Sequence, residues 1–209
     1  MKVYWIIACF AMMTVQYLIY QSIKWDTEEH KWQEWFFKGA ATAMSAVLAG
    51  YGYFSRPSVV HLLILIGLCV CVVADVILDM NFLAGTAAFG LGHVCYCAAM
   101  LLSHRPGWIN LIAFLVLAAA VLAVYPQIKK LRPGDNTLPY LGYALLISAM
   151  LSLAIGQSPI LLAGAALFVV SDAMLLARIV KQIPSKRYDY LCLGCYYLAQ
   201  FLIAASTLF

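Results

Sequence analysis

Charged residues are scarce in this chain, and their scarcity decides the class of protein. Aspartate, glutamate, lysine and arginine make up 11% of the 209 residues, against 65% hydrophobic residues and a mean hydropathy of +0.91. A typical soluble domain is about 25% charged, so this composition excludes a soluble globular protein and predicts an integral membrane protein. The formal net charge is only +4, and the basic residues lie between apolar runs, which argues against a nucleic-acid partner.

The sequence also lacks the short motifs of several enzyme classes. It has no G-x-S-x-G nucleophile elbow, no H-E-x-x-H zinc motif, no P-loop and no dinucleotide-binding glycine motif. Histidine pairs with the i, i+4 spacing of a helical metal site are absent as well. The residues therefore predict no cofactor, and a metal site has no support in the pattern.

Seven cysteines all fall within apolar runs. In the pairs Cys69-Val70-Cys71 and Cys95-Tyr96-Cys97 the two thiols point about 200° apart around a helix, so neither pair converges on one metal ion. We expect the cysteines to be buried small hydrophobic residues in preference to disulfides or metal ligands. The full set is Cys9, Cys69, Cys71, Cys95, Cys97, Cys192 and Cys195.

Apolar stretches long enough to cross a bilayer as helices, which takes about 20 residues each, recur along the whole chain. Proline, glycine and charged residues separate them. The predicted spans are 3–21, 33–54, 58–79, 83–103, 108–125, 138–155, 159–180 and 188–208. The first span has no clear cleavage site after it, so we expect it to remain as a helix. The predicted fold class is an all-α membrane protein, a single polytopic transmembrane domain over residues 1–209 built as a bundle of about eight helices.

The distribution of Lys and Arg predicts the orientation. Cytoplasmic loops are enriched in both residues, and the connections alternate between the two sides of the membrane. Lys38 is left out because it lies within a span, and Arg178 is counted as a charge at the end of the seventh helix. One side then holds Lys2, Arg56 and Arg105, and the other holds Lys24, Lys31, Lys129, Lys130, Arg132, Arg178, Lys181, Lys186 and Arg187. We therefore expect a multi-pass protein of the cell membrane with both termini outside.

Polar side chains within the spans are the candidates for function. Each ionisable group in a bilayer costs on the order of a few kcal/mol, so such groups face a protein interior or a wet cavity. The ionisable candidates are Lys38, Asp75, Asp79, His93 and Asp172, and their uncharged companions are Tyr96, Ser171, Tyr196, Tyr197 and Gln200. The predicted helix directions place Lys38, Asp75 and Asp172 in the cytoplasmic halves of their helices, as in a cavity that opens toward the cytoplasm.

Most of these residues have a structural alternative. Lys38 could be an interfacial anchor that reaches back to the headgroups. Asp79 lies beside the Met80-Asn81 turn, where a solvated helix end would explain it. His93 and the tyrosine and glutamine companions could hydrogen-bond one helix to another.

Asp75 and Asp172 are harder to explain structurally, because both follow apolar turns. An ion pair with Lys38 or His93 is the alternative for them. They lie in similar strings, VVADVIL and VVSDAML, four helices apart and therefore in the same orientation. This similarity indicates a four-plus-four parallel repeat, although so short a match in apolar sequence also arises by chance.

Five motifs taken together resemble a known family. The strings KWQEWFFKGA, ADVIL, GHVCY, LFVVSDAMLLA and CYYLAQFLI are similar, in order and spacing, to the YhhN-like family of integral membrane lysoplasmalogenases, over roughly residues 31–203. Ala74 stands where the family often has glycine, and Gly39 where it often has proline. Neither change removes a group that could take part in chemistry.

The resemblance implies a hydrolase that cleaves the vinyl ether bond of lysoplasmalogens and releases a fatty aldehyde with glycerophosphoethanolamine or glycerophosphocholine. The reaction begins with protonation of the outer vinylic carbon, and water captures the resulting oxocarbenium ion. It needs a protonated carboxylic acid and a nearby anion, which a desolvated pair of carboxyl groups can supply. We expect Asp75 and Asp172 to take these roles, as paired carboxylates do in glycosidases.

The remaining roles implied for the site are supporting ones. His93 is expected to hydrogen-bond an aspartate or orient water, and Lys38 to bind the headgroup phosphate of a lysophospholipid. Substrate positioning is expected from Tyr96, Ser171, Tyr197 and Gln200. The apolar helices would hold the alkenyl chain among membrane lipids.

Two other functions stay open at this point. Intramembrane Asp and His also build the proton relays of coupled transporters, and the repeat favours such a carrier. A lipid-binding membrane protein without catalysis is the other alternative. The five motifs in register favour the hydrolase.

Overall fold

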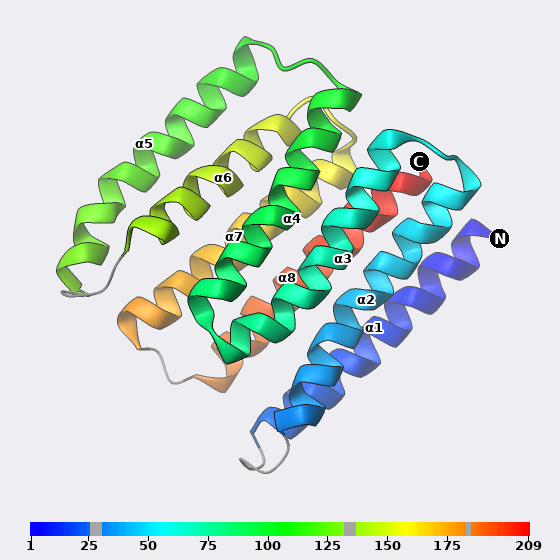
Figure 1. The fold of residues 1–209 in the computed structure, drawn as a ribbon, viewed down its shortest axis with the longest axis horizontal. Coiled ribbons are helices and arrows are strands. Elements are labelled where there is room, and N and C mark those ends of the chain that lie inside the picture. The colour runs from blue at the N-terminus through cyan, green and yellow to red at the C-terminus, as the bar shows by residue number, and fades with distance from the viewer. Residues whose placement is uncertain (26–30, 132–136, 183–184) are drawn as a thin grey trace.

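The computed structural model of the chain describes residues 1–25, 31–131, 137–182 and 185–209. Within these ranges the chain forms eight α-helices, one short 3-10 helix and no strand (Figure 1). The helices are α1 (Lys2–Lys24), α2 (Lys31–Ser55), α3 (Val59–Met80), α4 (Phe82–Ser103), α5 (Trp108–Leu131), α6 (Leu138–Ala154), α7 (Pro159–Lys181), α8 (Lys186–Ala205) and η2 (Ser206–Leu208).

Each of the eight predicted spans coincides with one of these helices, so the predicted all-α membrane class is confirmed. Six helices are long and apolar enough to cross a membrane; within the described ranges α2 and α6 are the exceptions. Helix α2, with 25 residues, is long enough to cross a membrane but is less apolar than those six, and α6 has only 17 residues. The chain is a multi-pass helical membrane protein.

One helix boundary was predicted wrongly. Helix α5 continues through Pro126 and ends at Leu131, whereas the predicted span ended at residue 125. A proline removes one backbone hydrogen bond and crowds the preceding turn, and near the end of a helix few bonds are lost. Arg132, counted above among the orienting charges, lies outside the described residues.

All five tryptophans lie near helix ends. Trp5 is in the first turn of α1 and Trp25 directly follows its last residue, Trp32 and Trp35 begin α2, and Trp108 begins α5. Tryptophan is enriched at the two interfaces of a membrane. These positions therefore mark both ends of a membrane-spanning bundle.

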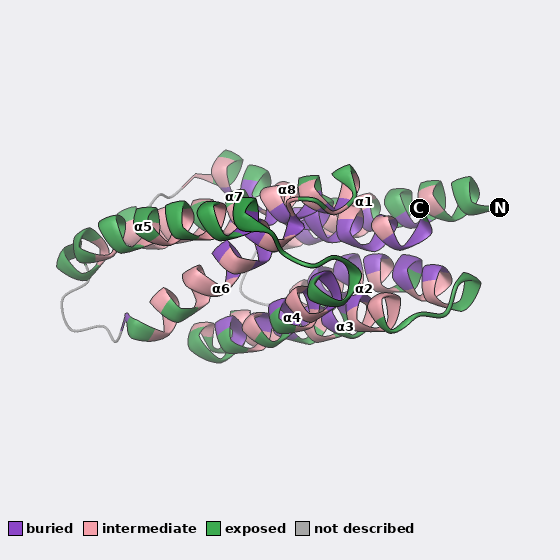
Figure 2. Ribbon diagram, turned by 90° about the horizontal axis from the view of Figure 1, so that it is seen from above, coloured by how far each residue is buried: buried purple, intermediate pink, exposed green. Residues whose placement is uncertain are grey.

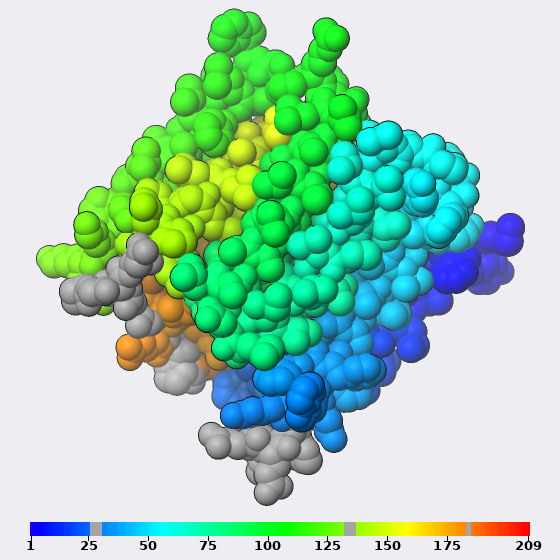
Figure 3. Space-filling model, viewed as in Figure 1, coloured from blue at the N-terminus to red at the C-terminus, as the bar shows by residue number. Residues whose placement is uncertain are grey.

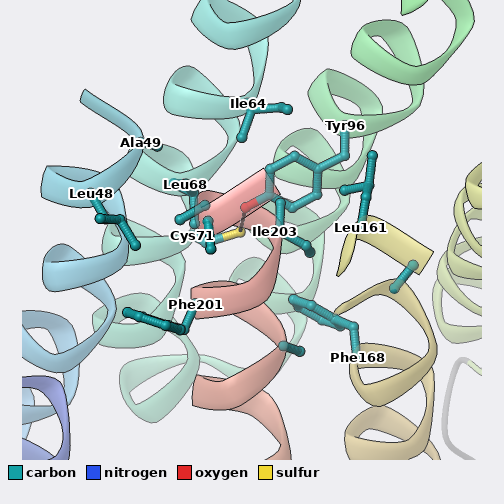
Figure 4. Packing of buried hydrophobic residues seen from close by; sticks show 14 of the residues in the cluster. Leu48, Ala49, Ile64, Leu68, Cys71, Tyr96, Leu161, Phe168, Phe201 and Ile203 are labelled. Carbon is teal, nitrogen blue, oxygen red and sulfur yellow. Dashed lines mark hydrogen bonds between the residues drawn. The ribbon is translucent and has the colours of Figure 1, made fainter. Parts of the chain in front are cut away.

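The helices form two rows. Viewed from above, α1, α8, α7 and α5 make one row and α2, α3 and α4 the other, and the buried residues lie mainly between them (Figure 2). Helices α2, α3 and α4 form a continuous surface on the face shown in Figure 3. The apolar core includes Leu48, Leu68, Phe168 and Ile203, which come from helices of both rows (Figure 4).

The packing of the helices has the pattern expected of a four-plus-four parallel repeat. Helix α3 packs most extensively on α4, and its counterpart α7 on α8. The fourth helix of each half packs on the second helix of the other, α4 on α6 and α8 on α2. Both termini lie at the same end (Figure 1), where the Lys2 Nζ donates to the Leu208 carbonyl oxygen at 2.9 Å.

The same small residue brings two helices together in each half. Gly67 of α3 and Gly164 of α7 each stand eight residues before the aspartate of their helix (67 to 75, 164 to 172). A Cβ atom on Gly67 would lie 3.0 Å from the Gly92 carbonyl oxygen of α4, and one on Gly164 would lie 3.1 Å from the Ala199 carbonyl oxygen of α8. Small residues allow such close backbone approach in membranes.

We expect Gly67→Ala to lower the free energy of unfolding by about 1–3 kcal/mol, the usual cost of overpacking. The new Cβ would lie 2.5 Å from the Tyr96 ring and 3.0 Å from the Gly92 carbonyl oxygen. This oxygen belongs to the backbone of α4, so it cannot move aside as a flexible side chain could. Gly142→Ala in α6 is the matched control, because no atom lies within 4 Å of its Cβ position. Unfolding of the detergent-solubilised protein, followed by circular dichroism, compares the two; equal shifts would contradict the close approach.

Candidate active site

A cavity of about 820 Å³ lies at one end of the bundle. All eight helices contribute side chains to its lining, and each does so mainly with the half that lies toward the connections α1–α2, α3–α4, α5–α6 and α7–α8. Its volume falls within the range of about 300–1,000 Å³ that is usual for small-molecule sites. Most of the lining side chains are apolar, and the charged ones come from five of the eight helices.

Half of the eight residues predicted for the site line this cavity. They are Lys38, Asp75, Ser171 and Asp172. The other four, His93, Tyr96, Tyr197 and Gln200, are buried behind the cavity wall in the helix packing. The Tyr96 ring, for example, lies in the apolar core beside Cys71 (Figure 4).

Asp75 is buried in α3 and accepts two hydrogen bonds on the same oxygen. The Thr42 hydroxyl of α2 donates to its Oδ2 at 2.5 Å, and the Tyr196 hydroxyl of α8 donates at 2.8 Å. Behind them, the Gln200 side-chain amide donates to the Tyr196 hydroxyl at 3.2 Å, and the Tyr96 hydroxyl donates to the Gln200 Oε1 at 2.9 Å. A chain of hydrogen bonds thus runs from the core to the carboxyl group.

Asp172 of α7 has one hydrogen-bond donor in the described part of the chain. The Tyr143 hydroxyl of α6 donates to its Oδ2 at 2.6 Å. Tyr143 also lines the cavity, and the sequence reasoning missed it, because a tyrosine within an apolar run is a weak signal by itself. Each aspartate is therefore held by a tyrosine from a different helix.

His93 does not form the expected hydrogen bond to an aspartate. Its Nδ1 lies 2.7 Å from the Phe89 carbonyl oxygen one turn earlier, and its Nε2 has no partner among the described residues. The ring packs edge-on against Phe168 and Tyr143, with centroid distances of 4.4 and 5.5 Å. His93 therefore contacts the aspartate networks through tyrosine rings, that of Tyr143 beside Asp172 and that of Tyr96 in the chain that leads to Asp75.

Lys38 forms an ion pair with Asp79, not with Asp75 or Asp172. Its Nζ donates to the Asp79 Oδ1 at 2.6 Å, and the lysine side chain is only 5% exposed. Asp79 lies one turn beyond Asp75 on α3 and lines the same cavity. The interpretation of Asp79 as a merely solvated helix end is therefore incomplete. The Tyr197 hydroxyl donates to the Lys38 carbonyl oxygen at 3.3 Å and ties α8 to α2.

Ser171 is tied to the neighbouring helix. Its hydroxyl donates to the Cys192 carbonyl oxygen of α8 at 3.0 Å.

All seven cysteines are free thiols. Burial was predicted correctly for Cys9, Cys71 and Cys192 but wrongly for Cys69, which faces outward from the bundle and is exposed. Within the described ranges no three His, Cys, Asp or Glu side chains converge as metal ligands.

A second charged group at the cavity was not singled out by the sequence reasoning. Asp189, in the first turn of α8, is buried and pairs with the Lys24 Nζ at 2.8 Å and with the Arg178 guanidinium. All three residues line the cavity. In the sequence, Lys24 and Arg178 serve only to predict the orientation of the chain in the membrane. Their proximity depends on helices α1, α7 and α8 meeting at one end of the bundle.

Comparison with known proteins identifies the family. Residues 33–207 match the YhhN family over most of the chain. The chain belongs to the YhhN family. It is 33% identical over 169 residues to the human lysoplasmalogenase TMEM86B, a match that covers 77% of this chain and 70% of the human protein. No solved structure matches.

The five motifs of this YhhN protein fall on the elements that build the site. ADVIL on α3 and LFVVSDAMLLA on α7 carry the two aspartates, and KWQEWFFKGA on α2 carries Lys38. GHVCY on α4 and CYYLAQFLI on α8 carry the tyrosine and glutamine side chains of the hydrogen-bond chain. The resemblance predicted from these strings is confirmed.

The hydrogen-bond chain predicts energetic coupling between Tyr96 and Gln200. Gln200→Leu removes the oxygen acceptor of the buried Tyr96 hydroxyl and one donor to the buried Tyr196 hydroxyl, and we expect a loss of about 1–3 kcal/mol in the free energy of unfolding. Tyr96→Phe combined with Gln200→Leu should cost less than the sum of the two single changes.

Unfolding titrations in detergent measure this double-mutant cycle. The control cycle pairs Tyr96→Phe with Tyr125→Phe, whose hydroxyl accepts from Thr137 at 3.0 Å at the end of α5, and it should be additive. Additivity in the Tyr96–Gln200 cycle would contradict the hydrogen-bond chain.

Proposed function

We propose that this YhhN protein is a membrane hydrolase that cleaves the vinyl ether bond of lysoplasmalogens and releases a fatty aldehyde with glycerophosphoethanolamine or glycerophosphocholine. The observation that carries the proposal is that Asp75 and Asp172, from similar strings in the two halves, line one cavity within the bundle. The similarity to a protein named lysoplasmalogenase supports the same activity.

The shape of the cavity suits an amphiphilic substrate. Helices α5, α6 and α7 line it with apolar residues, among them Leu117, Ala120, Val124 and Leu176, whereas charged residues gather near the ends of α1, α3 and α7. An alkenyl chain would lie against the apolar part, where each methylene group removed from water contributes about 0.8 kcal/mol. The polar headgroup would lie against the charged part.

The reaction needs one carboxylic acid and one carboxylate. The acid gives its proton to the outer vinylic carbon, and the double-bond electrons form the new C–H bond. The carboxylate stabilises the oxocarbenium ion and takes a proton from the attacking water. When the resulting hemiacetal collapses to the aldehyde, the deprotonated acid takes the proton of the hemiacetal hydroxyl, and the other carboxyl group gives its proton to the leaving glycerol oxygen. Both carboxyl groups thereby return to their starting states.

Hydrogen-bond donors suggest which aspartate takes which role. Asp75 accepts from Thr42 and Tyr196, whereas Asp172 accepts from Tyr143 alone. Hydrogen bonds to the charged form of a carboxyl group favour that form. Asp75 is therefore assigned as the carboxylate and Asp172 as the acid.

The other predicted residues take supporting roles in this proposal. His93 packs on Tyr143 and keeps its hydroxyl directed at Asp172. Tyr96 and Gln200 position the Tyr196 hydroxyl in the same way on the other side. Lys38, Ser171 and Tyr197 hold α2, α7 and α8 in register around the cavity.

The positive charges support a cytoplasmic active site. The cavity lies at the end of the bundle that carries the odd-numbered connections, to which the sequence tally above assigns nine of twelve Lys and Arg residues, against three at the other end. Because cytoplasmic loops are enriched in these residues, the site faces the cytoplasm of the cell membrane and both termini lie outside.

We expect Asp75→Asn and Asp172→Asn each to reduce aldehyde release from a lysoplasmalogen at least ~100-fold, the usual scale of general acid–base catalysis. Purified protein in detergent and an aldehyde assay measure the rates. Glu34→Gln on α2 is the matched control, a carboxyl-to-amide change outside the cavity lining. Undiminished release by either aspartate variant would contradict the two-carboxylate mechanism.

If the wild type releases no aldehyde but liposomes that contain the protein show substrate-dependent proton flux, the transporter alternative is favoured.

The apolar part of the cavity predicts chain-length selectivity. Ala120→Phe on α5 fills space beside the proposed alkenyl chain, and excluding about two methylene groups should cost about tenfold in kcat/KM for long-chain substrates. Short-chain substrates should be less affected. Ala119→Phe, the adjacent residue outside the lining, is the control, and equal effects of the two changes would place the chain elsewhere.

A further inference from the structure

Three charged residues at the cavity take no part in the chemical steps above. Lys24 is the last residue of α1, Arg178 lies in the last turn of α7 and Asp189 in the first turn of α8. The Lys24 Nζ lies 2.8 Å from the Asp189 Oδ2, and the Arg178 guanidinium pairs with the Asp189 Oδ1. We name these three residues the rim triad, and all of them line the cavity.

The rim triad has an unbalanced charge. Two cations share one carboxylate, which leaves a formal charge of +1. The Asp189 side chain is only 2% exposed, whereas the side chains of Lys24 and Arg178 are 23% and 26% exposed. The carboxylate is therefore covered, and the surplus positive charge is what an incoming ligand meets.

The Lys38–Asp79 pair at the same cavity does not offer this surplus. It joins one cation to one carboxylate, and the Lys38 side chain is 5% exposed while that of Asp79 is 30% exposed. An anion that approached this pair would meet the carboxylate first. Of the cations described at the cavity, those of the rim triad are thus better suited to an anionic ligand.

Donor capacity supports the same conclusion. A guanidinium group carries five N–H donors and an ammonium group three. Within the described part of the chain, each of the two cations donates to one oxygen of Asp189. The remaining donors of Arg178 can bind two oxygens of a phosphate in parallel, the geometry in which arginine binds phosphate best.

We propose that Arg178 and Lys24 bind the phosphodiester of the lysophospholipid headgroup, and that Asp189 is a positioning residue that holds the two cations together. This inference rests on the proposed function for the identity of the substrate. Asp172 and Arg178 lie six residues apart on α7, a rise of about 9 Å along the axis. The outer vinylic carbon and the phosphorus of a lysoplasmalogen are separated by seven bonds through the glycerol backbone, which in extended form span a distance of this order, so one substrate can reach both residues.

The test compares two substrates that differ only in the phosphate. A lysoplasmalogen with a choline headgroup and the corresponding alkenylglycerol, which has no phosphate, are assayed with the wild type, Arg178→Gln and Lys24→Gln. We expect each variant to raise KM for the lysoplasmalogen about tenfold or more, with kcat within about twofold. The KM for the alkenylglycerol should not change. Lys181→Gln, at the exposed end of α7, should leave both substrates unaffected.

A binding measurement separates this inference from the proposed function. A saturated ether analogue of the lysophospholipid has no vinyl ether bond to cleave, and its affinity can be measured by calorimetry in detergent even if the wild type releases no aldehyde. Arg178→Gln should weaken binding about tenfold or more, and Arg178→Lys, which keeps the charge but not the paired donors, should weaken it less. The saturated alkylglycerol should bind the wild type and the variants equally.

Three results would overturn the proposal. One is unchanged affinity of Arg178→Gln and Lys24→Gln for the ether phospholipid. Another is an equal loss for the phospholipid and the alkylglycerol, because this is the result of a damaged fold. The third is inorganic phosphate binding as tightly as the ether phospholipid, because the rim triad would then be a site for free phosphate.

Discussion

A carboxyl group inside a membrane-spanning bundle must find its hydrogen-bond donors within the protein, because lipid supplies none. This constraint organises the site. Tyr196 of α8 and Thr42 of α2 donate to Asp75, and Tyr143 of α6 donates to Asp172. Each aspartate therefore requires a defined rotation of a neighbouring helix, and the packing of α2, α6 and α8 is tied to the positions of two side chains on α3 and α7.

The helix packing meets this requirement in the same way in both halves. Gly67 and Gly164 allow α4 and α8 to approach α3 and α7 closely, and the fourth helix of each half then crosses to the second helix of the other. The halves differ where the cavity needs different chemistry. Asp79 in the first half corresponds to Leu176 in the second (each four residues after its aspartate), so α3 has a second carboxylate at the cavity where α7 has an apolar side chain.

Much of the architecture and part of the site could be predicted from the sequence. The eight helices follow from the lengths of the apolar runs, and Asp75 and Asp172 stand out because a carboxyl group in such a run has a high cost. The end of α5 could not be placed, since Pro126 costs few hydrogen bonds so close to a helix terminus. Tyr143 was missed because a tyrosine within an apolar helix is unremarkable until its partner is known.

The sequence by itself determined the class of protein, the order of its helices, the family and the two aspartates, because these depend on composition, on local spacing and on motifs in register. The tertiary structure alone decided that Lys38 pairs with Asp79, that His93 contacts Tyr143 and not an aspartate, and that Lys24, Arg178 and Asp189 meet at the cavity. Those contacts join helices far apart in the chain. They depend on which helices are neighbours and how each is rotated about its axis, and neither property is encoded in the hydropathy of a single span.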